Sequence, residues 1–373
     1  MKRVLYAVLA AGLLFSAVAS VQADGNRSPL VFDVGLRLWG LDLGVGYRGL
    51  ALLDGVDTTF WVYGGGAYEK MTYFRQSEVL IQGEYAGAAA DTEFYRADAN
   101  WQLGIVQGLT WNDRIKANGL EAMLFYRGRW NTNLLEAGDL ITGSGVTGEQ
   151  ELLQNTVFAG ISWNDVLVDK AHKGKGGIAA EASVDWGPGF FFNDMGGPSN
   201  FVRLNATARG FLPLYDAEPG RRGNLFSMYL AEFAAADYAI GLDGDPVPYI
   251  IRRTFGGMKP RTGLGNAVRG VDSGSLDVNL KIVNNLELRM NLPAIVLPDL
   301  VPGVVVHWDA GYFAQVGEAA GAASGFVSTI GAGLYINLFD LAHLAAYTHY
   351  RLDGVNADGS AWVPFDLQFG LHY

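Results

Sequence analysis

The chain has 373 residues, of which 50 are glycine and none is cysteine, and its formal net charge at neutral pH is −11. An acidic chain argues against nucleic acid as a partner, and a chain without cysteine cannot be stabilised by disulfides. Half of the residues are hydrophobic, yet no run of about 18 apolar residues follows residue 23, which excludes a transmembrane helix there.

The first 23 residues, MKRVLYAVLAAGLLFSAVASVQA, have the three parts of a secretory signal peptide. Lys2 and Arg3 form the positive start, an uncharged apolar segment follows, and a small-residue cleavage site ends at Ala23. We therefore predict that residues 1–23 are removed on export and that residues 24–373 form one domain. Because this removes two cations and no acid, the formal net charge changes from −11 to −13.

Apolar and polar residues alternate in many segments from residue 30 onward, which is the period of β-strands with one apolar face. In residues 41–52, one face carries Leu41, Leu43, Val45 and Tyr47, and the other carries Asp42, Gly44, Gly46 and Arg48. Strands that are apolar toward lipid and tolerate glycine toward a lumen are typical of closed membrane barrels. The sequence thus predicts an all-β fold, a transmembrane antiparallel up-and-down β-barrel.

The expected strands are 30–38, 41–52, 56–64, 67–76, 97–112, 119–134, 153–169, 177–192, 200–216, 224–241, 276–292, 304–316, 326–338, 342–352 and 362–373. Bacterial single-chain barrels have an even number of strands, so we predict about sixteen, with the missing strand within residues 76–112. Polar connections such as 317–325 alternate with apolar turns such as 292–300. Since the longer polar loops of such barrels are external, the glycine-rich segment 256–274 is predicted to be an external loop.

Four charged or titratable residues on the two strands after this loop are expected to face the lumen. On 304–316, the apolar face directs His307 and Asp309 inward, and on 276–292 the same pattern directs Glu287 and Arg289 inward. We interpret Glu287 and Arg289 as an ion pair of the lumen wall and His307 as a wall residue.

The loop itself, GGMKPRTGLGNAVRGVDSG, carries Arg269 between Val268 and Gly270. A loop can fold into a barrel only if its polar groups find partners there, and the planar guanidinium fork suits a carboxylate. We predict that the loop enters the lumen, that Arg269 pairs with Asp309, and that Gly270 permits a tight turn.

The last nine residues, FDLQFGLHY, alternate strictly up to the terminal aromatic residue. The apolar positions are Phe365, Leu367, Phe369, Leu371 and Tyr373. This tail resembles the C-terminal signature of Gram-negative outer-membrane barrels, which implies location in the cell outer membrane and contact with its lipid.

Four motifs together resemble the barrel of the outer-membrane assembly-factor superfamily, which includes BamA, TamA and the two-partner secretion transporters. These are "GG…NAVRGV", "NNLELRMNLP", "HWDAG" and "LQFGLHY", within residues 200–373. Family members carry a Val/Leu-Arg-Gly motif on a lumenal loop and an aspartate motif on a neighbouring strand. The resemblance places the loop motif on Val268, Arg269 and Gly270 and the strand motif on Asp309 and Gly311.

The sequence departs from this family in three places. Val271 stands where an aromatic residue is usual, and His307 stands where Phe or Gly is usual. The family's periplasmic POTRA domains have no room between Asp24 and Leu30, so we expect a barrel whose partner is a separate periplasmic protein or a client polypeptide.

Three functions remain open on the sequence. The resemblance implies insertion or transport of proteins or lipids at the outer membrane, and the alternative is a diffusion porin or structural barrel with a lumenal plug loop. An enzyme is disfavoured, because none of the five histidines lies in a recognisable nucleophile motif. We accordingly expect no catalytic residues, no metal site and no cofactor.

Overall fold

The computed structural model describes thirteen segments of the chain. They are residues 29–37, 40–50, 52–72, 93–135, 148–168, 175–193, 195–217, 226–271, 278–297, 300–316, 324–338, 342–354 and 359–369. The predicted signal peptide and the last residues of the C-terminal motif, including Leu371 and Tyr373, therefore lie outside the described residues. No helix within the described ranges is long and apolar enough to cross a membrane.

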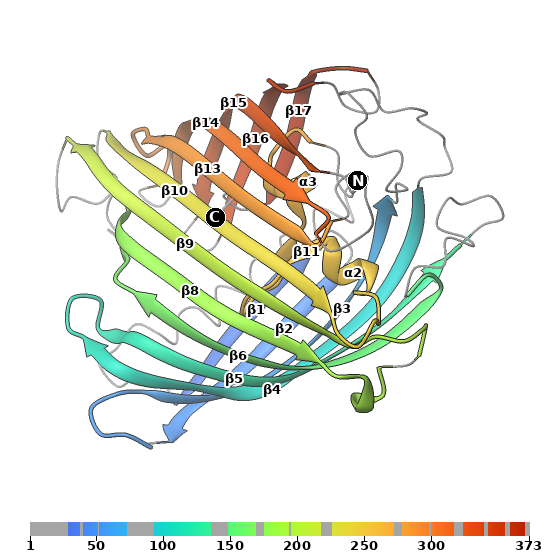
Figure 1. Ribbon diagram of the computed structural model, residues 1–373. Coiled ribbons are helices and arrows are strands. Elements are labelled where there is room, and N and C mark those ends of the chain that lie inside the picture. The colour runs from blue at the N-terminus through green and yellow to red at the C-terminus, as the bar shows by residue number, and fades with distance from the viewer. Residues whose placement is uncertain are drawn as a thin grey trace.

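One antiparallel sheet makes up almost the whole of the described structure, and it curls round as Figure 1 shows. Each long strand pairs with the next long strand along the chain, without crossovers. In order these are β1 (Leu30–Arg37), β2 (Gly40–Leu50), β3 (Thr58–Thr72), β4 (Glu93–Asn112), β5 (Ala117–Leu134), β6 (Glu151–Asn164), β8 (Lys175–Gly187), β9 (Phe201–Asp216), β10 (Ser227–Gly241), β13 (Leu280–Asn291), β14 (Leu300–Ala314), β15 (Ser324–Leu338), β16 (Ala342–Arg351) and β17 (Trp362–Phe369). The predicted all-β, up-and-down barrel fold is confirmed.

The described residues hold fourteen strands on this path, where the sequence predicts about sixteen. The segments 56–64 and 67–76 are one continuous strand, β3, because Gly64, Gly65 and Gly66 pair with β2 and β4 without a break. Merging these segments leaves nine long strands before the glycine-rich loop, an odd number that satisfies the parity of an external loop. Of the segment 76–112, which is predicted to contain an additional strand, residues 93–112 form β4 and residues 76–92 lie outside the described residues.

The two faces of the strands differ as the alternation predicts. On β2, Leu41, Leu43 and Val45 are exposed on the outside, whereas Gly44 and Gly46 are buried on the inside. On β14, Val306 and Trp308 are exposed, while His307 and Asp309 are buried. An outer face this rich in exposed apolar side chains is what a lipid-facing barrel requires.

Several glycines on the strands make room for aromatic rings of the neighbouring strand. A Cβ atom at Gly128 would lie 1.9 Å from the Trp101 ring, which is directly opposite in the β4–β5 register. Gly303 and Tyr335 have the same relation between β14 and β15, with a spacing of 2.1 Å. Rings that lie flat across glycines fix strand register, which gives the high glycine content a structural reason.

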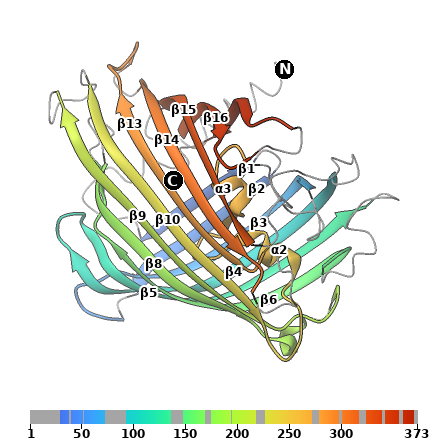
Figure 2. The ribbon, with the colours of Figure 1, turned by 45° about the horizontal axis from the view of Figure 1, so that its top comes forward.

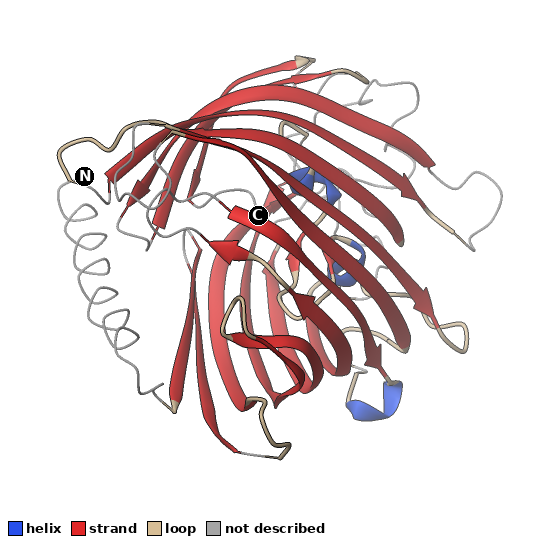
Figure 3. Cartoon of the chain, turned by 90° about the vertical axis from the view of Figure 1, so that its left-hand side faces the viewer, coloured by secondary structure: helices blue, strands red, loops and turns tan. Residues whose placement is uncertain are grey.

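The segment between β10 and β13 folds inward. It contains α2 (Tyr249–Arg252), β11 (Thr254–Phe255), β12 (Arg261–Thr262) and α3 (Leu264–Ala267). In Figure 2, α2 and α3 lie between β1–β4 on one side and β10–β16 on the other, and Figure 3 shows these helical turns inside the curve of the sheet. We call residues 249–271 the plug.

Two minor elements complete the description. β7 (Leu167–Val168) pairs only with β8, and the 3-10 helix η4 (Gly189–Phe191) lies in the connection between β8 and β9. Among the strand pairings of the described residues, none joins β1 to β17.

Candidate functional site: a plug anchored to the lumen wall

The tip of the plug is held by Arg269 against β14. Its Nε and Nη2 atoms donate to the two carboxylate oxygens of Asp309, each at 2.7 Å, and its backbone N–H donates to Oδ2 at 3.1 Å. Both side chains are fully buried. A bidentate guanidinium–carboxylate contact of this kind fixes orientation as well as distance, so the structure brings the two residues of the loop and strand motifs together.

A second carboxylate completes the environment of the arginine. Glu287 on β13 places Oε1 2.5 Å from Nη1 of Arg269, and its Oε2 accepts from Nε of Arg289 at 2.5 Å. Glu287 therefore joins the plug to the wall pair that the sequence predicts. Burial alone would lower the pKa of Arg269, but the charges of Asp309 and Glu287 outweigh it and hold that pKa above its ordinary value.

Apolar packing surrounds these charges. Leu264 and Val268 of the plug lie against Gly311, where a Cβ atom would come within 2.8 Å and 2.9 Å of them. The buried cluster to which they belong comprises Phe233, Ala235, Phe255, Leu264, Ala267, Val268, Val271, Val278, Val283, Phe313 and Val327. The absence of a side chain at Gly311 thus leaves the space that Leu264 and Val268 of the plug fill. Val271 is buried at the position where the family that the sequence resembles has an aromatic residue.

Gly270 turns the chain immediately after Arg269, with φ +81°. A Cβ atom there would lie 2.6 Å from the Cβ of His349 on β16. The left-handed backbone and the close approach to β16 both require glycine.

Gly270→Ala is therefore expected to loosen the tip of the plug. The left-handed conformation alone costs a non-glycine residue about 1–2 kcal/mol, and the clash with His349 adds to it. Gly244→Ala is the matched control, since Gly244 has φ +86° but open space around its Cβ position. Limited proteolysis of the folded barrel should show faster cleavage within the plug for Gly270→Ala than for Gly244→Ala, and equal rates would contradict the packing role.

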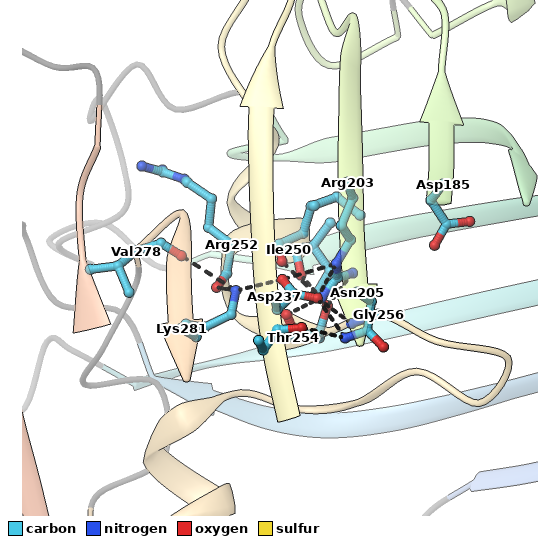
Figure 4. Close-up of polar contacts among 12 residues, drawn as sticks. Asp185, Arg203, Asn205, Asp237, Ile250, Arg252, Thr254, Gly256, Val278 and Lys281 are labelled. Atoms are coloured by element: carbon cyan, nitrogen blue, oxygen red, sulfur yellow. Dashed lines mark hydrogen bonds and ion pairs between the residues drawn. The ribbon is translucent and has the colours of Figure 1, made fainter. Parts of the chain in front are cut away.

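The base of the plug has its own anchor, centred on Asp237 of β10 (Figure 4). Oδ2 of Asp237 accepts from Nε of Arg203 at 2.8 Å and from the backbone N–H of Gly256 at 2.6 Å. Lys281 on β13 places its Nζ 3.3 Å from Oδ1. One buried carboxylate thus joins β9, β10, β13 and the plug.

The two cations of this anchor also bind the plug directly. Arg203 donates from Nη1 to the hydroxyl of Thr254 at 3.2 Å and from Nη2 to the Thr254 carbonyl. Lys281 donates to the carbonyl of Arg252 at 2.6 Å. Backbone carbonyls of the plug that would otherwise be buried without partners are thereby satisfied.

The plug also reaches the opposite wall. The backbone N–H of Met258 donates to Glu181 on β8 at 2.6 Å, and its carbonyl accepts from Arg127 on β5 at 2.8 Å. Lys259 forms an ion pair with Asp33 on β1 at 2.6 Å. Contacts with β1, β5, β8, β9, β10, β13, β14 and β16 make this segment a bridge across the lumen.

The lumen-wall residues named from the sequence are all buried on the inner face. His307 has its Nδ1 3.5 Å from Oδ2 of Asp309, and Nε2 lies 3.0 Å from Nδ1 of His349. The C-terminal positions Phe365 and Leu367 are exposed on β17, whereas the side chain of Phe369 lies outside the described set.

The sequence did not identify the anchor at Asp237, Arg203 and Lys281, nor the contacts of Glu181 and Arg127. The sequence feature that could have indicated this anchor is Asp237 itself, a single carboxylate on the strand face that also carries Phe233 and Ala235. Within the described ranges, no group of three or more His, Cys, Asp or Glu side chains is arranged to hold a metal ion.

We compared the chain with known families, curated proteins and solved structures. No protein-family model matches the chain, and no curated protein matches it. Among solved structures, the chain is similar to the crystal structure of BamA from Haemophilus ducreyi lacking POTRA domains 1–3, with a TM-score of 0.53 and 11% sequence identity. The match covers 91% of this chain and 63% of that one, so this chain shares the fold of the BamA barrel.

Proposed function

We propose that this protein is a Gram-negative outer-membrane β-barrel of the assembly or transport type, in which movement of the plug accompanies insertion or translocation of a protein or lipid. The shared BamA barrel fold, the apolar outer face and the signal peptide predicted from the sequence support this assignment. The mechanism needs no catalytic residue, and we propose none.

One observation carries the proposal: the plug contacts β1 at one edge of the sheet and β16, the neighbour of β17, near the other edge. Lys259 pairs with Asp33 on β1, and Gly270 packs on His349 of β16, which in turn contacts Asp366 on β17 at 3.3 Å. An unpaired strand edge can template a client strand by backbone hydrogen bonding. A plug that contacts β1 and is linked to β17 through His349 is placed to couple its own movement to the separation of those edges.

The alternative is a diffusion porin or a structural barrel with a static plug. It is favoured by the number of buried ion pairs that hold the plug, since breaking a buried pair is costly. The two functions differ in one requirement, because only the first needs the plug to move.

A reversible disulfide tests that requirement, and the absence of native cysteine leaves no competing thiol. A Cβ atom at Gly256 would lie 3.0 Å from the Cβ of Asn205, close to the roughly 3.5–4.5 Å that disulfides prefer. The pair Asn205→Cys and Gly256→Cys should therefore fix the plug to β9 when oxidised. The matched control is Gly189→Cys with Asn200→Cys, 4.0 Å apart within a single connection away from the plug.

The readout is the protein and lipid composition of the outer membrane in cells whose own copy is replaced by each variant. We expect oxidation of the plug pair to reproduce the loss caused by deleting the gene, and reduction to reverse it, with no effect in the control pair. If the oxidised plug pair supports a normal outer membrane while deletion does not, plug movement is not part of the function.

A further inference from the structure

We propose that the connection between β8 and β9 is a membrane anchor, in which Phe190 and Phe192 enter the acyl chains of the lipid leaflet at the external end of the barrel. The connection lies on the same side of the barrel as the plug, because the two strands β9 and β10 separate them. In Figure 1 its 3-10 helix, η4, lies beyond the ends of β8 and β9, apart from α2 and α3. The inference rests on the lipid-facing outer wall and does not depend on what the barrel transports.

Two aromatic side chains of this connection have no cover within the described structure. Phe190 is 70% exposed and Phe192 is 78% exposed, and residues 187–193, GPGFFFN, carry no charge. Phe192 also has a left-handed backbone, with φ +60°, which is unfavourable for a bulky residue. An unfavourable conformation that exposes an apolar ring indicates a contact outside the chain.

The connection folds over the outer face of the wall. The ring of Phe190 meets that of Trp186 edge-on, with centroids 5.8 Å apart, and Trp186 belongs to the exposed outer face of β8. On β6, Asn155 points outward as well, because its Oδ1 accepts from the hydroxyl of the outward-facing Tyr126 at 2.6 Å. Asn155 is nevertheless only 6% exposed, because the connection covers it and its amide donates to the carbonyl of Phe191 at 2.8 Å. The connection therefore continues the lipid-facing surface.

Asn193 is the positioning residue that holds the connection against β6. Its buried amide accepts from the backbone N–H of Asn155 at 2.5 Å, and donates to the carbonyls of Asn155 and Pro188, each at 2.8 Å. The β6–β8 register, continued by two residues, would place Pro188 opposite Asn155, and proline has no N–H to donate. Asn193 thus takes the place of a strand partner. An environment of lipid requires this, because a backbone group without a hydrogen bond is costly in hydrocarbon.

The chemistry of the connection favours lipid over a protein partner. Its amides are turned toward the wall and hydrogen-bonded there, so the surface presented outward is that of aromatic rings without charge. Apolar side chains of interfacial segments enter the boundary between headgroups and acyl chains by roughly 5–10 Å. Rings that lie against the outer wall at the end of a membrane-spanning strand are placed at this depth.

The test is lipid quenching of a fluorophore on one introduced cysteine, since the chain has none of its own. The full chain is folded into vesicles of dioleoylphosphatidylcholine, with and without phosphatidylcholine that carries a nitroxide near the headgroup end of its acyl chain. We expect labelled Phe190→Cys and Phe192→Cys to lose as much fluorescence to the nitroxide lipid as labelled Leu204→Cys. Leu204 is on the exposed outer face of β9 and reports the lipid-facing wall.

Gly244→Cys is the matched control at the same end of the barrel. Gly244 has a left-handed backbone like Phe192, with φ +86°, and open space around its Cβ position. We expect its label to be quenched by aqueous iodide and not by the nitroxide lipid. Labels at positions 190 and 192 that behave like this control overturn the inference and leave the two rings to a protein partner. A label at position 204 that is not quenched by lipid overturns the membrane location of the wall together with the inference.

A second pair of variants tests the role of Asn193. Asn193→Ala, added to labelled Phe192→Cys, removes the hydrogen bonds to β6 and should reduce quenching by the nitroxide lipid. Asn200→Ala is the control in the same connection, because the amide of Asn200 donates to the exposed Asp243 at 2.9 Å instead, and it should leave the quenching unchanged. Equal quenching in the two variants overturns the positioning role of Asn193.

Discussion

Arg269→Ala is expected to release the tip of the plug and to destabilise the folded barrel by about 3–5 kcal/mol, because it leaves the buried carboxylate of Asp309 without its arginine. Asp309 loses two side-chain donors, and Glu287 loses one close ion pair. Urea titration of the folded barrel should measure the loss of stability, and proteolysis should show cleavage within residues 249–271. Because β-strand pairing is untouched, we expect the barrel itself to form.

The matched control is Arg114→Ala, which removes an arginine–aspartate pair of nearly the same length on the surface. Arg114 lies 2.8 Å from Asp165, and the two side chains are 50% and 27% exposed. Such exposed pairs contribute about 0–1 kcal/mol. Exchanging the charges, Arg269→Asp with Asp309→Arg, should restore part of the stability that each single change removes. Equal effects of Arg269→Ala and Arg114→Ala, or no recovery in the exchanged pair, would contradict the anchoring role.

Asp237→Ala is expected to have an effect as large as that of Arg269→Ala, at the other end of the plug. The change leaves the guanidinium of Arg203 and the ammonium of Lys281 buried together without a carboxylate, and it removes the acceptor of the Gly256 N–H. Removing one partner of a buried ion pair costs about 3–5 kcal/mol. Denaturant unfolding of the refolded protein measures this loss.

Asp237→Asn separates charge from shape, because the amide keeps an oxygen for the Gly256 N–H but gives up the negative charge. We expect it to lose most of the stability that Asp237→Ala loses, whereas Asp165→Asn, on the surface, should change stability by less than about 1 kcal/mol. If Asp237→Asn were as stable as the wild type, hydrogen bonding alone would hold the base of the plug.

Much of this architecture could be predicted from the sequence because alternate residues of each β-strand face the two sides of the barrel wall. The alternation on 304–316 and 276–292 is enough to direct Asp309 and Glu287 to the same wall, and the β13–β14 register places them close together. The pairing with Arg269 needed the family resemblance as well, since alternation carries no information about where a loop folds.

The second anchor could not be predicted for a related reason. On β10 the inward face carries Tyr229, Phe233 and Ala235 as well as Asp237, so it is as apolar as a lipid-facing side. Periodicity separates two faces but does not say which one faces the lumen when a plug supplies apolar partners inside. The sequence wrongly predicts two strands in place of β3 for a local reason. Gly64, Gly65 and Gly66 interrupt the alternation of apolar and polar residues, while the backbone pairing continues.

Thiol accessibility on whole cells measures whether residues 249–271 are enclosed in the lumen. The chain has no cysteine, so one introduced thiol is the only target for a membrane-impermeant maleimide. Val268 is fully buried against the wall, whereas Pro246 is exposed just before α2. We predict rapid labelling of Pro246→Cys, and labelling of Val268→Cys only after Arg269→Ala is added. Equal labelling of the two single-cysteine proteins would place the tip of the loop in outside solvent and contradict enclosure of the plug in the lumen.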